Sequence, residues 1–425
     1  LEFRRVLFRS DAQNVLSKTY QNGFGGSLQL SLLKDLMGHH NNFTVGASAD
    51  WSRVRFNQDS YDAGLVNYQT ITSSSTAADW TRLKARSDYY GLFATDNFAF
   101  NDQWNMTLSG RYNIAKVDLN GDTKDDAGAL NGNHEYKRFN PAIGLNYNPS
   151  KSLGFYGGYN EGMRAPTPVE LSCANADKPC SLPTGFNSDP DLKKVVAKTW
   201  EGGVRGKFNQ DINWNIGFYD TRTENDIQFI YASTNSSMGY FQNVGSTERK
   251  GIEIGLHGKV EKISFAANYG FVDATYQSSF DVNTIADQQT VSKGNRIPGI
   301  ARQTFKLRTS YEITPTWNVG GNLVAATGQY AHGAENNQVL AGVSPKIPGY
   351  AILNLDTNYN LTSNWNLFAK VNNIFDKEYS TFGQLGQNIY TTDYEQFRTP
   401  SAPRAGWLGI TYNFGSIKKS DSEKD

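Results

Sequence analysis

The feature that most constrains the fold is a strict alternation of apolar and polar residues near the C-terminus. Residues 404–414 read Arg-Ala-Gly-Trp-Leu-Gly-Ile-Thr-Tyr-Asn-Phe, so that Leu408, Ile410, Tyr412 and Phe414 alternate with small or polar residues such as Gly409. Because successive side chains of a strand point to opposite faces, this segment predicts a strand with one apolar face. Alternation in a single strand is common, so the prediction depends on whether the rest of the chain repeats it.

The alternation recurs along the chain, at residues 212–218, 252–256, 263–271, 353–359 and 365–371. The other face of these segments carries Asn, Gly, Ser and charged residues, which suits a water-filled lumen better than a packed interior. An inward-facing Glu253, Asp356 or Lys370 would be costly in a dry core but not beside water. Phe368 falls on the polar face, as a lumen with bound contents would allow. The apolar face is therefore predicted to contact lipid.

The composition agrees with a membrane β-barrel. Hydrophobic residues make up only 38% of the 425 residues, whereas aromatic residues reach 13%. Aromatic girdles around a barrel require such an excess. No apolar run approaches the length of a transmembrane helix, which excludes a helical membrane protein. Lys and Arg total 41, as do Asp and Glu, and this zero formal charge gives no indication of nucleic-acid binding.

Short turns and long polar segments follow each other along the chain, as in bacterial barrels. Compact turns are expected at Asn101-Asp102, Asn148 to Lys151, Asn209 to Asp211, Glu261-Lys262, Thr314-Pro315 and Thr362 to Asn364. Long loops are expected at Asp59 to Leu83, Asp118 to Glu135, Pro166 to Val196, Gln277 to Ile300, Gln329 to Pro348 and Asp376 to Pro400; such loops usually carry function. This division predicts about fifteen strands, and an odd number cannot return both termini to the periplasm. The first segment, Gly23 to Leu33, is therefore not expected to be the first strand of the barrel.

The two ends of the chain do not fit this rhythm. Residues 1–10 resemble non-native or junction sequence, and we exclude them from the fold. Residues 11–414 are expected to form part of a barrel. Residues 415–425 are rich in charge and predict a disordered periplasmic tail. The sequence starts without an initiator Met or a signal peptide, so we expect a mature chain or a fragment.

Ordered motifs resemble those of TonB-dependent outer-membrane receptors. They include Gly162-Met163-Arg164-Ala165-Pro166-Thr167 with Glu170, Thr199-Trp200-Glu201-Gly202, Asn243-Val244-Gly245, Ile297-Pro298-Gly299, Asn372-Asn373-Ile374-Phe375-Asp376 with Tyr379, and Pro403-Arg404. The residues that carry the resemblance are Gly162, Arg164, Pro166, Glu170, Glu201, Asn372, Asn373, Phe375, Tyr379, Pro403 and Arg404. Separately, Gly409, Tyr412 and Phe414 resemble the C-terminal signal through which outer-membrane barrels are recognised and inserted.

The resemblance implies an all-β fold, a transmembrane antiparallel β-barrel of 22 strands filled by a plug. It also implies a receptor in the outer membrane of a Gram-negative bacterium that imports a scarce ligand, in the commonest case a ferric siderophore. Its partners would be TonB with the inner-membrane energising complex, the barrel assembly machinery and outer-membrane lipid. No cofactor and no catalytic activity are implied. The chain departs from the family by continuing past Phe414 and by lacking the plug, the TonB box and the first several strands. We therefore expect it to be unable to import a ligand alone.

The cysteines Cys173 and Cys180 lie in one long loop segment and are the only two in the chain. The cell envelope permits disulfides, and closing so short a loop would stabilise it by about 2 to 3 kcal/mol. The alternatives are two free thiols or a metal-binding pair, and the lack of a nearby histidine disfavours the metal. We therefore predict a Cys173–Cys180 disulfide and no metal site.

The remaining candidates are histidines and loop aromatics. His39 and His40 are expected in a periplasmic turn, and His134 and His332 in outer loops, where solvated side chains are the rule. No catalytic spacing of Ser, His and Asp and no paired-carboxylate motif stands out. The loop aromatics could contact an iron chelate or pack on one another, namely Tyr61, Tyr68, Tyr330, Phe382, Tyr390, Tyr394 and Phe397, with Arg398 nearby. None is assigned to the ligand, so the ligand-binding residues are unknown from the sequence.

Two other functional classes fit part of the pattern. A passive, porin-like barrel would need no plug and would narrow its lumen with an inward loop. A soluble protein with several β-sheets would bury the apolar faces in a core, but its long polar loops would have no evident purpose. Solubility without detergent would identify the soluble class.

Overall fold

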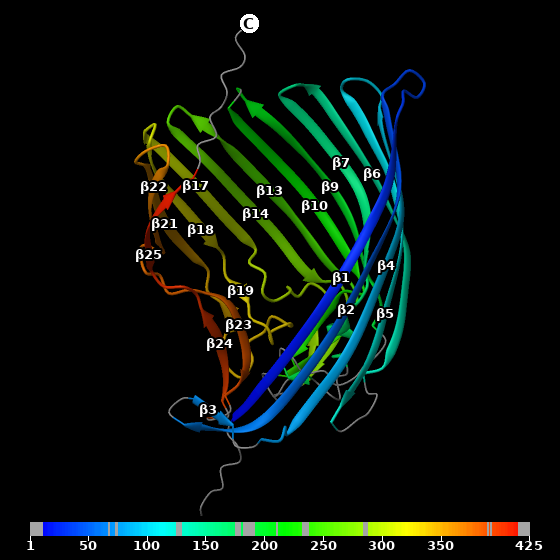
Figure 1. The fold of residues 1–425 in the computed structure, drawn as a ribbon, viewed down its shortest axis with the longest axis vertical. Helices are drawn as coiled ribbons and strands as arrows, with labels where there is room; N and C mark the ends of the chain where they lie inside the picture. Colours follow the sequence, from blue (N-terminus) through cyan, green and yellow to red (C-terminus); the bar gives the residue numbers. More distant parts are fainter. Residues whose placement is uncertain are drawn as a thin grey trace, which may run out of the picture.

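The computed structural model describes residues 12–66, 69–72, 75–124, 130–174, 180–181, 192–209, 211–231, 238–283, 288–388, 391 and 393–414. Residues 1–10, predicted as junction sequence, and residues 415–425, predicted as a periplasmic tail, lie outside the described residues. The described chain is almost entirely β-structure. One sixteen-stranded antiparallel sheet curves around the long connections between its strands (Figure 1).

Fifteen of the sixteen strands pair in sequence order, and β3 (Gln69–Thr72) pairs only with β2. The fifteen are β1 Ala12–Leu33, β2 Asn41–Val66, β4 Asp79–Ala99, β5 Trp104–Thr123, β6 Gly132–Ser150, β7 Leu153–Arg164, β9 Val195–Phe208, β10 Ile212–Glu224, β13 Thr247–Val260, β14 Ile263–Tyr276, β17 Gln303–Thr314, β18 Trp317–Ala326, β21 Tyr350–Asn360, β22 Trp365–Asn372 and β25 Ala405–Tyr412. This number confirms the predicted one. Within the described residues, β1 and β25 form the two edges of the sheet and do not pair with each other.

The short turns all lie at one rim of the sheet, the upper rim in Figure 1, and each predicted compact turn is found there. Asn209 and Glu261 adopt positive φ angles of 57° and 51° in two of these turns. The left-handed conformation reverses the chain within a few residues, and Asn tolerates it better than most side chains. His39 and His40 lie at the turn between β1 and β2, as predicted.

The long connections lie at the opposite rim and contain small elements of their own (Figure 1). These elements are α1 Pro168–Leu171, β8 Cys180–Ser181, β11 Ile227–Tyr231, β12 Met238–Asn243, β15 Phe280–Asn283, β16 Gln288–Val291, β19 Gln329–Tyr330, β20 Lys346–Ile347, β23 Ser380–Gln387 and β24 Tyr394–Pro400. Among the described residues, no helix is both long and apolar enough to cross a membrane.

Three sequence-based expectations about this rim were wrong. The strands β2, β4 and β5 run well into the segments expected to be loops, because their alternation continues there with polar outward residues. His134 lies in strand β6 rather than in a loop. The connection between β10 and β13, which carries the β11–β12 hairpin, was not recognised as a long loop.

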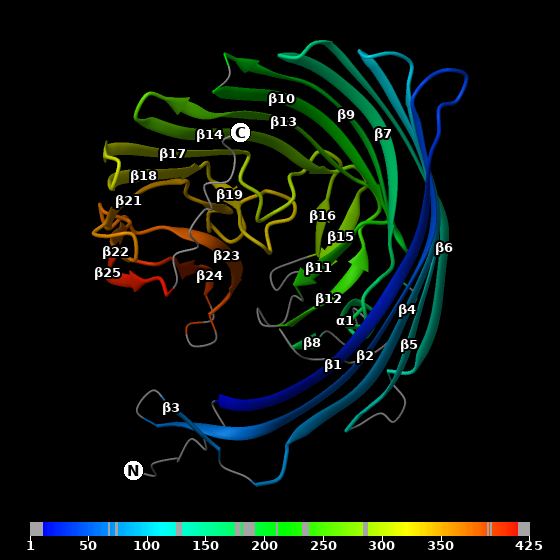
Figure 2. The same cartoon turned by 45° about the horizontal axis from the view of Figure 1, so that its top comes forward.

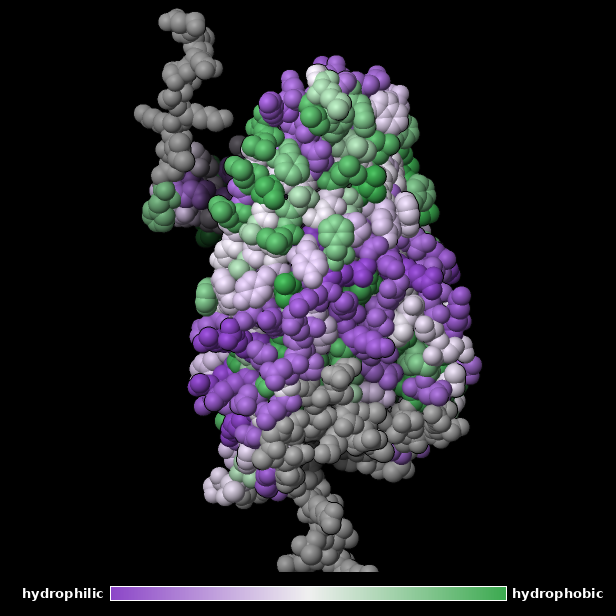
Figure 3. Space-filling view, turned by 90° about the vertical axis from the view of Figure 1, so that its right-hand side faces the viewer, coloured by the Kyte–Doolittle hydropathy of each residue, from purple (hydrophilic) through white to green (hydrophobic). Residues whose placement is uncertain are grey.

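The two faces of the sheet differ as the alternation predicted. On the convex face, apolar side chains such as Leu28 and Leu92 are exposed, by 81% and 64%, in the half of the sheet nearer the short turns. Figure 3 shows this apolar zone, and a hydrophilic zone on the same face nearer the long connections. The concave face is polar in the half next to the short turns, where Arg111 donates a hydrogen bond of 2.6 Å to Ser48 Oγ. An apolar belt outside a polar lumen is the pattern of a transmembrane barrel.

Phe368, the aromatic residue on the polar face, has a packing role. Its ring lies over Gly409 of the neighbouring strand, where a Cβ atom would approach the ring to 2.2 Å. A side chain at position 409 would therefore displace the ring. This contact explains why the inward face of the last strands holds both an aromatic residue and a glycine, and aromatic cover of a strand glycine also stabilises the sheet.

Candidate functional site

The long connections after β7, β10, β14, β18 and β22 fold inward over the concave side of the sheet, whereas β3, in the connection after β2, lies apart from them (Figure 2). The connection between β7 and β9 contributes Leu171 and Leu192 to a buried cluster. The sheet contributes inward-facing residues of β2, β4 and β5, among them Phe56, Leu83 and Leu119. The concave face is therefore apolar beside this connection and polar nearer the short turns. This apolar contact holds the connection at the rim.

Two further buried clusters order the other connections. The first joins the β11–β12 and β15–β16 hairpins to the end of β14 through residues such as Ile230, Val291 and Tyr276. The second is smaller and holds Ala331, Ala334, Ile347 and Leu385, so that it joins the connection after β18 to the β23–β24 hairpin. Together the connections form an ordered layer with its own apolar packing at one end of the polar lumen.

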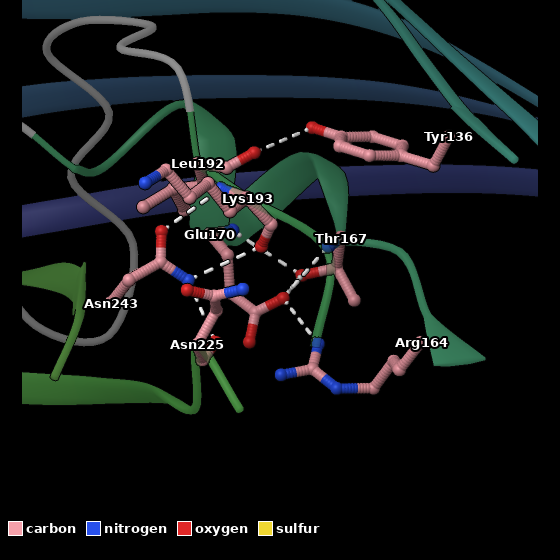
Figure 4. Close-up of polar contacts among 8 residues, drawn as sticks. All are labelled: Tyr136, Arg164, Thr167, Glu170, Leu192, Lys193, Asn225 and Asn243. Atoms are coloured by element: carbon pink, nitrogen blue, oxygen red, sulfur yellow. Dashed lines mark hydrogen bonds and ion pairs between the residues drawn. The ribbon is translucent and has the colours of Figure 1, made fainter. Parts of the chain in front are cut away.

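The Gly162-to-Glu170 motif fixes the start of this layer. Glu170 Oε2 accepts hydrogen bonds from the backbone N–H of Thr167 at 2.7 Å and from Arg164 Nη1 at 2.7 Å. The Thr167 hydroxyl in turn accepts a bond from the backbone N–H of Glu170, which completes a capping box at helix α1 (Figure 4). Pro166 is fully buried. These contacts turn the chain sharply from strand β7 into the rim layer.

A second clamp closes the same connection. The Asn243 side chain accepts a bond of 2.9 Å from the backbone N–H of Lys193 and donates one of 2.8 Å to the backbone oxygen of Asn225 (Figure 4). Tyr136, on strand β6, donates its hydroxyl to the backbone oxygen of Leu192 at 3.0 Å. Asn243 thus joins the return of one long connection to the β11–β12 hairpin of the next.

The Asn372-to-Asp376 motif forms a third clamp, centred on Asn373. This residue is 2% exposed and has a φ angle of 50°. Its side chain accepts a bond from the backbone N–H of Lys377 at 2.9 Å and donates to the backbone oxygens of Lys377 and Ala402, at 3.0 and 3.3 Å. Asp376 Oδ1 accepts the backbone N–H of Arg404 at 2.8 Å. The clamp thereby joins the end of β22 to the Pro403-Arg404 segment before β25.

The other motif residues are dispersed. Glu201 lies on β9 opposite Gly158 and, within the described residues, makes no hydrogen bond or ion pair. Phe375 is 74% exposed, and the ring of Tyr379 packs on that of Tyr350 at 4.6 Å. Among the residues that resemble the insertion signal, Tyr412 packs against Trp365 with 4.6 Å between ring centroids and the rings tilted by 52°. The motif residues are therefore not gathered in one pocket, and their contacts are those of fold determinants.

We propose that Cys173 and Cys180 form the predicted disulfide. The structure describes no free cysteine, and Cys173 is disulfide-bonded. Backbone pairing supports the partner, because strand β12 contacts both segments. The backbone N–H of Phe241 donates to the Cys173 oxygen, and Gly239 pairs with Cys180.

The loop aromatics divide into packed and exposed residues, while Tyr68 and Tyr390 lie outside the described residues. The cations of Arg296 and Lys346 both lie over the ring of Tyr330, at 5.6 and 5.4 Å from its centroid. Tyr394 packs against the cluster around Leu385. Phe382 and Phe397 of the β23–β24 hairpin are 40% and 42% exposed. Arg398 follows on the same hairpin. The hairpin therefore offers exposed rings and a guanidinium at the rim.

Glu335 is a buried carboxylate within the rim layer, 4% exposed. Burial raises the pKa of Glu335, and backbone hydrogen bonds to its carboxylate, among them one of 3.0 Å from the Gly333 N–H, offset this only in part. Burial, reinforced by the charge of Glu335, raises the pKa of Tyr394 to about 12. Burial also lowers the pKa of nearby His332. No sequence pattern indicates this group, because a single Glu in a polar loop is usually solvated.

The Glu335 carboxylate makes the rim layer sensitive to pH. Because its folded pKa is raised, the folded state binds a proton more tightly, and stability falls as pH rises from the ordinary Glu pKa through the raised one. We expect Glu335→Gln, which keeps the acceptor for Gly333, to remove this fall. Hydrogen exchange of residues 331–347, corrected for intrinsic rates, measures it. The wild type and the Glu335→Gln variant both keep His332, so any difference between their pH profiles is due to Glu335. An equal pH dependence of exchange in the two proteins would contradict the expectation.

Comparison with known proteins adds to this geometry. A family model described as "TonB dependent receptor-like, beta-barrel" matches residues 3–374. The probable TonB-dependent siderophore receptor PiuA of Acinetobacter baumannii is 23% identical over 381 residues, covering 87% of this chain and 47% of that protein. The metal-pseudopaline receptor CntO of Pseudomonas aeruginosa (strain UCBPP-PA14) is 20% identical over 332 residues, covering 77% of this chain and 41% of that protein.

The fold also matches solved structures. The crystal structure of the siderophore receptor PiuA from Acinetobacter baumannii superposes with a TM-score of 0.71 at 18% identity, covering 93% of this chain and 56% of that chain. The copper transporter OprC superposes with a TM-score of 0.69 at 16% identity, covering 94% of this chain and 58% of that chain. At such identities the likeness concerns the fold. The chain spans about half the length of the curated relatives that it matches.

Proposed function

Since the chain belongs to the TonB-dependent receptor-like β-barrel family, as its motifs indicated, we propose that it forms the barrel of an outer-membrane receptor that imports a ferric siderophore with energy from TonB. The family is one of transport receptors, which agrees with the absence of a catalytic motif from the sequence. Two relatives are named as a probable siderophore receptor and a metal-pseudopaline receptor, and these names support an iron or metal chelate as the ligand.

The observation that carries the proposal is the asymmetry of the two rims. One rim has only tight turns, whereas the long connections at the other fold inward and pack on the concave face. A general pore needs an open mouth, but a receptor needs a shaped surface at which a large ligand is held. An ordered layer, clamped by Glu170, Asn243 and Asn373, provides such a surface.

Energy from the inner membrane follows from the physics of the compartment. The outer membrane has no ATP and little usable potential, and a barrel as wide as the family's leaves an open lumen unless a plug fills it. Concentrating a scarce ligand therefore requires mechanical work on the plug. In the family TonB supplies that work, and we propose the same for the protein that contains this barrel.

Two exposed residues of the β23–β24 hairpin, Phe397 and Arg398, are our candidates for ligand contact; they are consecutive on β24 and project from its two faces. Phe397 can stack on an aromatic chelating group, and Arg398 can pair with the negative charge of a ferric chelate. We expect Phe397→Ala with Arg398→Gln to weaken binding about tenfold or more, the effect of losing one charged pair and one ring contact. Binding of ferric catecholate, hydroxamate and carboxylate chelates to the full-length protein, measured by tryptophan fluorescence, tests this.

A matched control removes an aromatic and a cation from the other rim. Phe208 and Lys207 are adjacent and exposed there, so that Lys207→Gln with Phe208→Ala should bind like the wild type. If the hairpin variant binds as tightly as this control, the ligand contacts a different part of the rim. If no chelate of the three classes binds the wild type, the proposed ligand class is wrong.

A further inference from the structure

Two rows of polar residues cross the convex face of the sheet between its apolar belt and the long connections. In register across neighbouring strands, Asn22 pairs with Arg53, Arg53 with Arg86 and Arg86 with Asp118. One step nearer the long connections, Tyr20 pairs with Arg55, Arg55 with Lys84 and Lys84 with Asn120. Facing residues on adjacent strands lie on one side of the sheet, so the side chains of both rows share the convex face.

These rows line a groove of about 930 Å³, which we call the basic groove. Its charged residues are four cations, Arg53, Arg55, Lys84 and Arg86, and one carboxylate, Asp118. Arg86 is paired with Asp88 at 2.6 Å. Arg53, Arg55 and Lys84 are exposed, and no residue in the described part of the chain pairs with them. Three cations on two adjacent strands repel one another, so they favour an anion between them.

The groove borders the zone that faces the membrane. One step nearer the short turns than the row of Arg53, the ring of Phe24 stacks on Trp51 at 5.2 Å, and Trp51 Nε1 donates to Tyr90 Oη at 3.2 Å. Trp and Tyr gather where the bilayer meets water. Still nearer the short turns the same face is apolar, with Leu28 and Leu92 exposed, and Figure 3 shows the hydrophilic zone directly beside it. Arg53 lies two residues along β2 from Trp51, about 7 Å, and Arg55 with its neighbour Lys84 lies two residues farther, about 13 Å away. The cations therefore begin at the depth of the lipid headgroups.

We propose that the basic groove binds the phosphorylated headgroup of a lipid in the outer leaflet. The assignment rests on the outer-membrane location proposed above but not on the transported ligand. The occupant follows from charge and position, because unpaired cations beside an aromatic interface lie where a lipid presents its phosphate. The acyl chains of that lipid then lie along the apolar belt, on the short-turn side of the groove. A nucleic acid or a soluble protein would leave this continuity with the belt unexplained.

The test compares two triple variants of the full-length protein. The groove variant combines Arg53→Gln, Arg55→Gln and Lys84→Gln and so removes the three unpaired cations of the basic groove. The matched control variant combines Lys151→Gln, Lys207→Gln and Lys262→Gln and so removes three exposed cations from the rim with the short turns. Each protein is reconstituted into phosphatidylcholine vesicles with and without lipid A, extracted in detergent, and analysed for bound lipid A by mass spectrometry. Heat-modifiable gel migration verifies that both variants are folded.

We expect the groove variant to retain about tenfold less lipid A than the control variant, an effect of the size expected for several headgroup contacts. The difference should shrink as salt rises. Equal retention by the two triple variants would overturn the proposal. So would displacement of lipid A by inorganic phosphate at the same phosphorus concentration, since the groove would then be a site for free anions. Chelate binding by the same preparations reports the proposed function separately.

Discussion

Replacing Asn373 by alanine should largely abolish assembly of the barrel. The change leaves the backbone groups of Lys377 and Ala402 without the side chain that satisfies them, in a position only 2% exposed. It also places alanine at a φ angle of 50°, where asparagine is better tolerated. We estimate the loss at about 4 kcal/mol, from unsatisfied buried groups and backbone strain together. The fraction of folded barrel and its urea midpoint, both from heat-modifiable gels, measure it.

Two further variants separate the causes. Asn373→Gly restores the freedom of the backbone but not the hydrogen bonds, so it should recover about 1 kcal/mol of the loss. Asn120→Ala removes an exposed strand asparagine that makes no hydrogen bond in the described structure and should leave assembly unchanged. If Asn373→Ala assembled as well as Asn120→Ala, the clamp would not hold the ends of β22 and β25 together.

The sequence predicted the sheet well because its main signal is local. The alternation at residues 212–218 and 263–271 depends only on which side chains face lipid and which face water, and both became strands of the sheet. The turns were found for the same reason, since short polar segments between alternating runs mark them locally, and Asn209 and Glu261 adopt positive φ angles in two of them. Phe368 is the exception to the alternation, because its ring lies on the polar face. It covers Gly409 of the neighbouring strand, and the sequence alone could not show that these two residues are neighbours.

The rim layer could not be predicted in the same way because its contacts are distant in sequence. Leu171 and Leu83 share one buried cluster, and the His332 backbone N–H donates to the backbone oxygen of Gly383; no local pattern connects either pair. The burial of Glu335 depends on the same packing.

The ends of β2 and β4 were misplaced for a different reason. Beyond the lipid belt the outward face of a strand becomes polar, so a continuing strand has the composition of a loop.

The family motifs were informative about the fold rather than about the ligand. Glu170, Asn243 and Asn373 each satisfy backbone groups at places where a long connection starts or ends. Such groups must be satisfied whatever the ligand is. The surface available to a ligand lies instead on residues outside the motifs, such as Phe397 and Arg398. This division explains why the motifs indicate the family but not the ligand.

Energy dependence is the property that separates the proposed receptor from a passive barrel. A passive barrel passes its solute down a gradient, at a rate proportional to concentration. A receptor that holds a chelate at an ordered rim instead saturates, and it releases the chelate into the lumen only when work is done on the plug. Loss of TonB should therefore stop transport but leave binding at the rim intact.

The most direct test is the uptake of radiolabelled iron chelate by cells whose other iron receptors are deleted and which express the full-length protein that contains this barrel. The chelate is the one that binds the purified protein. Uptake should be saturable, should fall to the level of cells without the receptor when TonB is deleted, and should leave cell-surface binding unchanged. Uptake that rises in proportion to concentration and continues without TonB would contradict the account and indicate a passive barrel.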